Sequence, residues 1–310
     1  MRKYIIKRLV NLIPVLLALT FLVFLLMSLT PGDPALLRLT AAGTPVTDEL
    51  LQATREEMGL NQPFITRYLQ WLGNIVTRLD FGISYADDMP IFPKLMKALR
   101  NTLMLAAAST VFSCAIAIPL GIITAIKRDT AVDNIVRVFT FTGNAMPNFL
   151  IALLLMYLFC IKVKLFPVIA KGSIKGLFLP TLALSIPMIS RFARQTRADV
   201  INQLGEEYVI GMHARGVKEN TILYRNVLHN AMGSIFTIIS LQIRTLIGGS
   251  VVTEVIFRWP GVGSLIMDSL KVRDYPVVQG AVLILATLQI LVNLVTDLSY
   301  SLIDKRIQLE

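Results

Sequence analysis

The sequence predicts an all-α membrane protein with six transmembrane helices. Of its 310 residues, 55% are hydrophobic and only 16% are charged, whereas about a quarter of the residues of a soluble domain carry charge. The missing charges leave long apolar windows, several of which reach the roughly 20 helical residues that cross a bilayer. A disordered chain and an ordinary cytosolic protein are therefore excluded.

Six windows are candidates for these helices. Four are free of charge and long enough to span the membrane: Leu9–Leu29, Leu103–Ile126, Val138–Ile161 and Tyr275–Thr296. Gly176–Ser190 is short, so its helix must continue past Arg191, and Asn226–Thr253 is interrupted by Arg244. The first window resembles a signal peptide in following basic residues, but its apolar run exceeds the usual 7–15 residues and no Ala-x-Ala-like site follows. An uncleaved first span is therefore the better interpretation.

The basic residues indicate how the chain is oriented, because cytoplasmic loops are enriched in Lys and Arg. Six spans place both termini on one side, and most basic loop residues fall on that side: Arg2, Lys3, Lys7, Arg8, Lys127, Arg128, Arg137, Arg191, Arg194, Arg197, Arg215, Lys218, Arg225, Lys305 and Arg306. One loop disagrees, because it places Lys162, Lys164, Lys171 and Lys175 outside. We expect both termini in the cytoplasm, and we interpret the net charge of +10 as orientation in the lipid bilayer, with no nucleic acid as partner.

The chain divides into three predicted parts. Residues 1–30 form an N-terminal tail and the first transmembrane helix. Residues 31–100 are too polar to span and form an extracytoplasmic helical subdomain, with one helix opening at Thr47 and ending at Gly59 and another starting after Pro63. Residues 101–310 form a five-helix core, in which a cytoplasmic loop covers about residues 191–230.

Catalytic and metal-binding patterns are missing from the sequence. It contains no GxxxxGK motif followed by Ser or Thr and therefore no P-loop. The two histidines, His213 and His229, cannot form an HExxH zinc site, and Cys114 and Cys160 do not form a CxxC pair. We therefore expect half of a membrane channel, a transporter or a scaffold, and not an enzyme, with no catalytic or metal-ligating residues.

Polar side chains inside the spans are candidates for a translocation path, because they are costly in hydrocarbon. The candidates are Asn144, Asn148, Gln242, Arg244, Gln289 and Asn293, with Asp297 one turn further on. The alternative for each is a hydrogen bond between helices, which contributes only about 1 kcal/mol.

The loop after the fourth span has the most specific pattern. Residues 206–218 predict a short amphipathic helix followed by a glycine break, and a second helix runs through residues 227–231. A rigid projection of this kind can be held in a partner's groove and can transmit a rigid-body motion.

This loop resembles the EAA loop of binding-protein-dependent ABC importers of the peptide/nickel permease family. The matching residues are Tyr208, Val209, Ala214, Gly216, Leu228, Asn230 and Ala231. Further motifs of the family occur in the same order on both sides of this loop: Pro31-Gly32-Asp33-Pro34, Asp80-Phe81-Gly82-Ile83-Ser84, Asn101-Thr102-Leu103, Met146-Pro147-Asn148-Phe149, Gly248-Gly249, Glu254, Phe257, Trp259-Pro260-Gly261-Val262-Gly263 and Arg273-Asp274-Tyr275-Pro276. The chain departs from the family pattern at Met212, Gly233, Arg244 and Asp304-Lys305.

The resemblance implies a type I ABC importer permease bundle in the bacterial cytoplasmic (inner) membrane. It implies a second homologous permease chain, two cytoplasmic ATPase subunits and an extracytoplasmic substrate-binding protein as partners. ATP and magnesium would bind to the ATPases, and this chain would bind no cofactor. The residues expected to couple to the ATPases are Glu207, Tyr208, Val209, Met212, His213, Ala214, Arg215, Gly216 and Val217.

The resemblance leaves the substrate open. The short loop of residues 162–179 and the stretches 32–36 and 47–72 look closest to nickel permeases, so we expect nickel or a nickel chelate. The C-terminal stretch 276–298 resembles dipeptide permeases equally well, so import of di- or oligopeptides is the alternative. A secondary transporter that uses no ATP is more distant, because no inverted repeat is visible.

Overall fold

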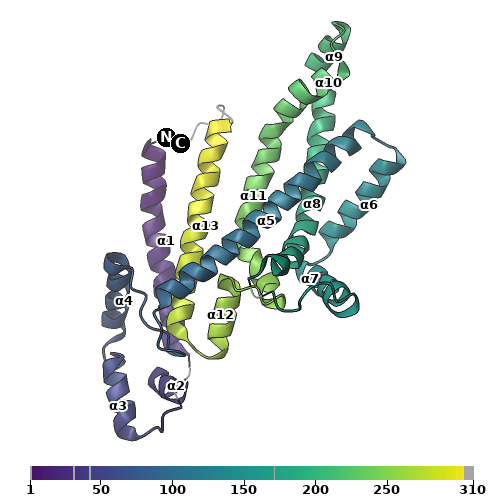
Figure 1. Cartoon of the computed structure of the whole chain (residues 1–310). Coiled ribbons are helices and arrows are strands. Elements are labelled where there is room, and N and C mark those ends of the chain that lie inside the picture. Colours follow the sequence, from purple (N-terminus) through teal and green to yellow (C-terminus); the bar gives the residue numbers. More distant parts are fainter. Residues whose placement is uncertain (1, 31, 42, 171, 304–310) are drawn as a thin grey trace. The chain divides into compact units, whose positions relative to one another are not determined.

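The computed structural model describes residues 2–30, 32–41, 43–170 and 172–303. Within these ranges every regular element is a helix, and the only β pairing is an isolated bridge between Ile83 and Pro90. The all-α prediction is therefore confirmed (Figure 1). The predictions made for Pro31, Lys171, Asp304, Lys305 and Arg306 lie outside the described residues.

The chain forms two compact units. The first lies within Met1–Thr102 and Pro260–Leu291, and the second within Leu103–Trp259 and Val292–Glu310. The first unit contains α1 (Arg2–Leu29), α2 (Pro34–Ala41), α3 (Asp48–Glu57), α4 (Phe64–Arg78) and α12 (Val262–Lys271). The second contains α6 (Ala131–Ala145), α7 (Asn148–Met156), η1 (Tyr157–Lys162), α8 (Ile174–Leu204), α9 (Glu207–Ala214), α10 (Glu219–Thr221), η2 (Ile222–Val227) and α11 (Leu228–Ile256). Two long helices, α5 (Ile91–Ile126) and α13 (Tyr275–Ile303), contribute residues to both units.

Two of the small helices of the first unit, α3 and α4, begin where the sequence predicts. Thr47 caps α3, because its hydroxyl oxygen accepts a hydrogen bond from the Leu50 backbone N–H at 3.3 Å. α4 begins directly after Pro63 and packs on α1, where Phe24 lies 5.4 Å from the Phe64 ring and 5.6 Å from the Tyr68 ring. Aromatic edge-to-face packing of this kind fixes α4 against the first span.

A second set of contacts closes the first unit. Ile91 and Leu95 at the start of α5 are fully buried together with Val277 and Ala281 of α13. The carboxylate of Asp274, just before α13, accepts hydrogen bonds from the Ser84 hydroxyl and, at 3.0 Å, from the Tyr85 backbone N–H. The loop before α5 and the N-terminus of α13 are thereby held together.

Helix α8 is the central helix of the second unit, with α6, α7 and α11 packed against it. Small residues permit the close approach of its neighbours. A Cβ at Gly121 of α5 would lie 2.6 Å from the Thr196 side chain of α8, and a Cβ at Gly143 of α6 would collide with the Ser190 hydroxyl. Small residues at helix crossings are typical of packing inside membranes.

The window Val138–Ile161, predicted as one span, is not a straight helix. It is divided into α6 and a second segment, α7 with η1, and the two segments meet at an angle of 103°. Pro147 has no N–H to continue the helix, and the residue before a proline is pushed out of the helical region. Met146 accordingly has an extended backbone with ψ 132°.

The lengths and hydropathy of the helices are compatible with the six predicted spans. Ile91–Ile126, Ile174–Leu204 and Tyr275–Asp297 are each long and apolar enough to cross a membrane. Three bent pairs raise the number to six if each pair makes one span: α1 with α2, α6 with α7 and η1, and the two segments within 219–256. The helix through Gly176–Ser190 does continue past Arg191, as expected from its short window.

Candidate functional site

Three of the predicted path residues lie together around Arg191 of α8. The Arg191 guanidinium donates from Nε to Asn144 Oδ1 at 2.9 Å and from Nη1 to Gln242 Oε1 at 3.1 Å. Beside it is a cavity of about 170 Å³. The residues that line this cavity are Asn148, Leu184, Pro187, Met188, Arg191, Gln242, Thr245, Leu246 and Gly249.

The bend at Pro147 explains why the two asparagines lie at this cavity. Asn144 is in the last turn of α6 and Asn148 is the first residue of α7, so the break places both amides at the junction of the two helices. Gln242 comes from α11, and Arg191 lies seventeen residues after the start of α8 at Ile174. At 1.5 Å per residue, Arg191 is about 26 Å along a helix of membrane-spanning length.

The chemistry of this cavity favours groups that accept hydrogen bonds. Arg191 carries the only charge among the lining residues, and it is positive. A guanidinium has five N–H donors, and Arg191 uses two of them in the bonds to Asn144 and Gln242. The others remain for a carboxylate or a peptide carbonyl, which arginine binds well.

Sequence reasoning assigned Arg191 to the cytoplasmic face and did not include it among the path residues. The signal that identifies it is available in the sequence, since an arginine that interrupts a transmembrane helix is a functional candidate by default. Counting Arg191 with the basic residues of the cytoplasmic face hid this signal, although the helix was expected to continue past it.

Arg244 and Asn293 form a separate cluster. Arg244 donates from Nε to Asn293 Oδ1 at 2.6 Å and pairs through Nη2 with Asp297 Oδ1 at 3.2 Å. The Arg244 side chain is 27% exposed and that of Asp297 16%, so the ion pair is largely shielded from water. It connects α11 to the last turns of α13. Gln289 lies on the portion of α13 that belongs to the first unit.

A buried carboxylate, which the sequence did not single out, connects α6 to α8. Asp133 is fully buried and accepts hydrogen bonds from Arg197 at 2.8 Å and from Arg137 at 2.6 Å. Because a buried charge must be paired to be tolerated, Arg137 and Arg197 stabilise the packing of α6 on α8.

The predicted coupling loop forms a compact projection at α9. Val209 is 2% exposed and packs with Val200, Ile222 and Val227. The Tyr208 hydroxyl donates to Gln203 Oε1 at 2.9 Å. One side of α9 is thereby fixed to the ends of α8 and η2.

Gly216 ends this projection with a Schellman motif. The Val217 N–H bonds to the Met212 carbonyl at 3.1 Å, and the Gly216 N–H bonds to the His213 carbonyl at 2.9 Å. Gly216 has φ +72°, and no atom lies within 4 Å of a Cβ built on it. Glycine is therefore favoured at this position by the backbone conformation, and not by a close neighbour within the described chain.

The opposite side of α9 is open. Ile210 is 63% exposed, and so is Tyr224 of η2. Glu207, His213, Ala214 and Arg215 are exposed as well, and His213 Nδ1 lies 3.2 Å from Glu219 Oε1. The sequence did not single out Ile210 or Tyr224, although apolar side chains presented to solvent on a rigid helix are suited to a partner's groove.

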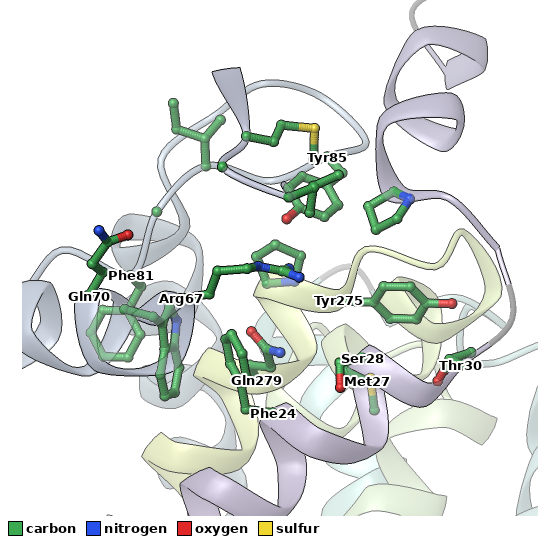
Figure 2. Close-up of a pocket in the computed structure, with 18 of the residues that line it drawn as sticks. Phe24, Met27, Ser28, Thr30, Arg67, Gln70, Phe81, Tyr85, Tyr275 and Gln279 are labelled. Carbon is green, nitrogen blue, oxygen red and sulfur yellow. The ribbon is translucent and has the colours of Figure 1, made fainter. Parts of the chain in front are cut away.

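The first unit encloses a larger cavity of about 470 Å³ (Figure 2). Arg67 and Gln70 of α4, Tyr85, and Tyr275 and Gln279 of α13 line it. The cavity is polar on the side formed by α4, and burial raises the pKa of the Tyr85 phenol, partly opposed by the Arg67 guanidinium. No metal-binding group of three or more His, Cys, Asp or Glu side chains is present among the described residues.

Comparison with known proteins covers nearly the whole chain. A family described as "Binding-protein-dependent transport system inner membrane component" matches residues 117–309, and its N-terminal region matches residues 1–106. Similar proteins include the oligopeptide transport system permease protein AppB of Bacillus subtilis, 36% identical over 99% of this chain and 100% of that protein. The probable peptide ABC transporter permease protein y4tP of Sinorhizobium fredii is 34% identical over 98% and 99% of the two chains.

Two further proteins extend the comparison. The glutathione transport system permease protein GsiC of Escherichia coli is 34% identical over 99% of each chain. Among solved structures, a chain of the MetNI methionine ABC transporter in an inward-facing conformation matches with a TM-score of 0.57 and 16% identity, over 68% of this chain and 96% of that chain. The latter similarity shows the fold, which is that of a type I importer permease.

Proposed function

Because the chain belongs to the family of binding-protein-dependent transport system inner membrane components and is a permease subunit of an ABC importer, we propose that it imports di- or oligopeptides. Members of this family are permeases embedded in the membrane, and the substrate passes through them.

The cavity at Arg191 is the observation that supports a peptide. A single positive charge beside two amides attracts carboxylates and hydrogen-bonds peptide groups. A divalent cation would meet a like charge there, since Arg191 is the only charged residue that lines the cavity. The similarity to relatives named for peptide and glutathione transport, over 98–99% of this chain, supports the same substrate class.

The expectation of nickel finds no support in these observations. It depended on short stretches of the outer segment and on the length of the loop at residues 162–179. The relatives described above are named for oligopeptides, peptides and glutathione, and their similarity extends over those same stretches. Peptide import, the alternative drawn from the sequence, is therefore the better-supported function.

Asn144, Asn148, Gln242 and Arg191 form the proposed contact with substrate on the translocation path. The hydrogen bonds from Arg191 to Asn144 and Gln242 orient the amides. Arg244 and Asn293 act instead in the contact between α11 and α13, because their polar groups are engaged with each other and with Asp297. Gln289 stays a candidate on sequence grounds alone.

The proposed partners follow from the family. A second permease chain completes the pore, two cytoplasmic ATPases hold ATP and magnesium, and an extracytoplasmic binding protein delivers the peptide. The ATPases would contact residues 207–217, where exposed Ile210 enters the ATPase groove and the Schellman turn at Gly216 fixes the angle of the projection. If the ATPases bind residues 207–217 on the cytoplasmic side, a bundle of six spans has both termini in the cytoplasm.

Two measurements test this function. Affinity purification of the chain from its own host should recover an ATPase and a second permease, which a carrier that uses no ATP would lack. The binding protein encoded with it should then be titrated calorimetrically with di- and tripeptides and, separately, with nickel salt and a nickel chelate. We expect saturable peptide binding and no nickel binding; the reverse result would overturn the peptide assignment while leaving the importer assignment intact.

A further inference from the structure

Helix α4 (Phe64–Arg78) has three faces of different chemistry. Phe64, Tyr68, Trp71 and Ile75 form the face that packs on α1 and into the core of the first unit. Arg67, Gln70 and Asn74 form a polar face that lines the 470 Å³ cavity (Figure 2). Ile65, Leu69, Leu72 and Val76 form the third face. At about 100° per residue these four lie within roughly 60° of one another.

The third face, which we call the outer stripe, is exposed at three of its four residues, and Leu72 is half-buried. Ile65 is 53% exposed, Leu69 58% and Val76 73%. Leu79, directly after the helix, is 60% exposed. Single exposed apolar side chains are normal on a protein surface, but an aligned row of them indicates an interaction surface.

The position of α4 along α1 indicates what covers this stripe. The Tyr68 hydroxyl lies 3.0 Å from the Thr20 hydroxyl and donates to the Leu17 carbonyl at 3.2 Å. The Phe64 ring packs edge-on against Phe21 at 5.6 Å. These partners belong to the apolar run Leu9–Leu29 of the first span.

The depth of this contact follows from helix geometry. Thr20 lies nine residues before Leu29, the end of α1, which is about 13 Å along the helix axis. Half of the hydrocarbon core is about 15 Å thick. The hydroxyl of Tyr68 therefore reaches toward the middle of the membrane, and its helix lies beside the part of α1 that is within hydrocarbon.

We propose that α4 is embedded in one leaflet of the bilayer, with its outer stripe in contact with lipid acyl chains. Apolar side chains of α1 that lie next to α4 are exposed as well, since Leu17 is 42% exposed and Phe21 37%. Its polar face meanwhile lines the cavity at Arg67. Under the proposed orientation this leaflet is the outer one, so the segment 31–100 is partly a membrane-inserted element and not only an extracytoplasmic subdomain.

Nitroxide accessibility tests this placement. In a chain with Cys114 and Cys160 replaced by Ala, the variants Leu69→Cys and Val76→Cys carry the label on the outer stripe. Gln70→Cys and Asn74→Cys are matched controls, because they lie on the same helix but on its polar face. Each labelled chain is reconstituted with its partner subunits in phospholipid vesicles, and relaxation by oxygen is compared with relaxation by a water-soluble nickel chelate.

The expected result is a several-fold higher ratio of oxygen to chelate accessibility at positions 69 and 76 than at 70 and 74. Access of the chelate to positions 69 and 76 would place the stripe in water and overturn the proposal. Low accessibility to both reagents would mean that a protein chain covers the stripe, and that result would overturn it as well. Because all four side chains are exposed or line the cavity, the variants need no repacking to fold.

Discussion

Arg191 lies on the central helix α8 and donates hydrogen bonds to two amide side chains. Its role can be tested separately from that of its neighbours. Arg191→Met keeps an unbranched apolar stem but removes the guanidinium, and with it the charge and the donors to Asn144 and Gln242. If the guanidinium binds the carboxylate or carbonyl of a peptide, loss of a charged hydrogen bond costs about 1.5–3 kcal/mol. We expect the KM for peptide uptake to rise by about tenfold or more.

Arg194→Met is the matched control for this prediction. Arg194 is also an exposed arginine of α8, but it lines the separate cavity beside Asp133. Uptake kinetics should change much less in this variant. Equal effects of the two substitutions would show that the position of the charge does not matter and would remove Arg191 from the path.

Gly216 is the second residue whose proposed role can be tested by substitution. Gly216→Asp places a charged side chain on this turn at φ +72°, a left-handed conformation that aspartate enters less readily than glycine. The turn after α9 should distort, so that the chain inserts normally while stimulation of the ATPase by the loaded binding protein is lost. The readouts are ATPase activity in the reconstituted complex and recovery of the ATPase by pull-down.

Two control variants separate the backbone effect from the added charge. Gly216→Asn adds a side chain of the same size without the charge, and asparagine and aspartate both enter the left-handed conformation. Retained coupling in Gly216→Asn would therefore assign the loss in Gly216→Asp to the charge, and an equal loss would assign it to the backbone. Gly205→Asp adds the same charge at the end of α8, where φ is −83° and any residue fits. Full stimulation in Gly216→Asp would show that the conformation of this turn does not control energy transfer.

At the scale of elements, the ion pair between Arg244 and Asp297 connects α11 and α13. Arg244→Met removes the cation that pairs with Asp297, and Asp297→Asn removes the anion. We expect each single variant to lower the unfolding temperature of the purified complex, and the double variant to be less destabilised than the sum. The coupling should be about 1–2 kcal/mol.

Transport kinetics distinguish this structural role from a role in the path. If Arg244 were a substrate contact, Arg244→Met would change the KM for peptide as strongly as Arg191→Met does. If it connects the helices, the unfolding temperature falls and the KM stays near its original value. A zero coupling energy would contradict the ion pair itself.

The elements that the sequence predicted well are those whose signal is local. The apolar windows in α1, α5 and α13, the Thr47 cap and the break at Gly216 each depend on a run of residues or on one backbone preference. The 103° bend between α6 and α7 was not predicted, although Pro147 was noted within the span. A proline in a membrane helix is compatible with a mild kink or a full break, and the surrounding packing decides between them.

The candidate site was predicted only in part for a related reason. Asn144, Asn148 and Gln242 stand out in the sequence as polar residues in apolar windows, but nothing in the sequence indicates which of them meet. Arg191 was counted with the basic residues of the cytoplasmic face, although its helix was expected to continue past it. Asp133 and its partner Arg197 are 64 residues apart in the sequence. Long-range contacts of this kind depend on how helices cross, which periodicity does not determine.

At the scale of the whole molecule, the orientation in the membrane is the property on which the other assignments depend. Both termini and Lys218 are expected in the cytoplasm, with Asp88 outside. Single cysteines at Asp88 and Lys218, in a chain without Cys114 and Cys160, should be labelled by an impermeant maleimide from opposite sides. In intact cells, with the outer membrane made permeable where one is present, we expect labelling at position 88 only.

Lys218 follows the proposed coupling helix directly, so its labelling tests more than the topology. Modification at position 218 from outside would reverse the bundle and place α9 away from any cytoplasmic ATPase. Labelling at position 88 from the cytoplasmic side alone would have the same meaning.

ATP-driven peptide uptake by the reconstituted importer tests the central claim most directly. The permease pair and the ATPases are placed in vesicles with ATP inside, and the binding protein loaded with labelled tripeptide is added outside. The account predicts that peptide accumulates in the vesicles only when ATP, the ATPases and the binding protein are all present, and that nickel does not compete. Accumulation without ATP, or uptake of nickel in place of peptide, would contradict it.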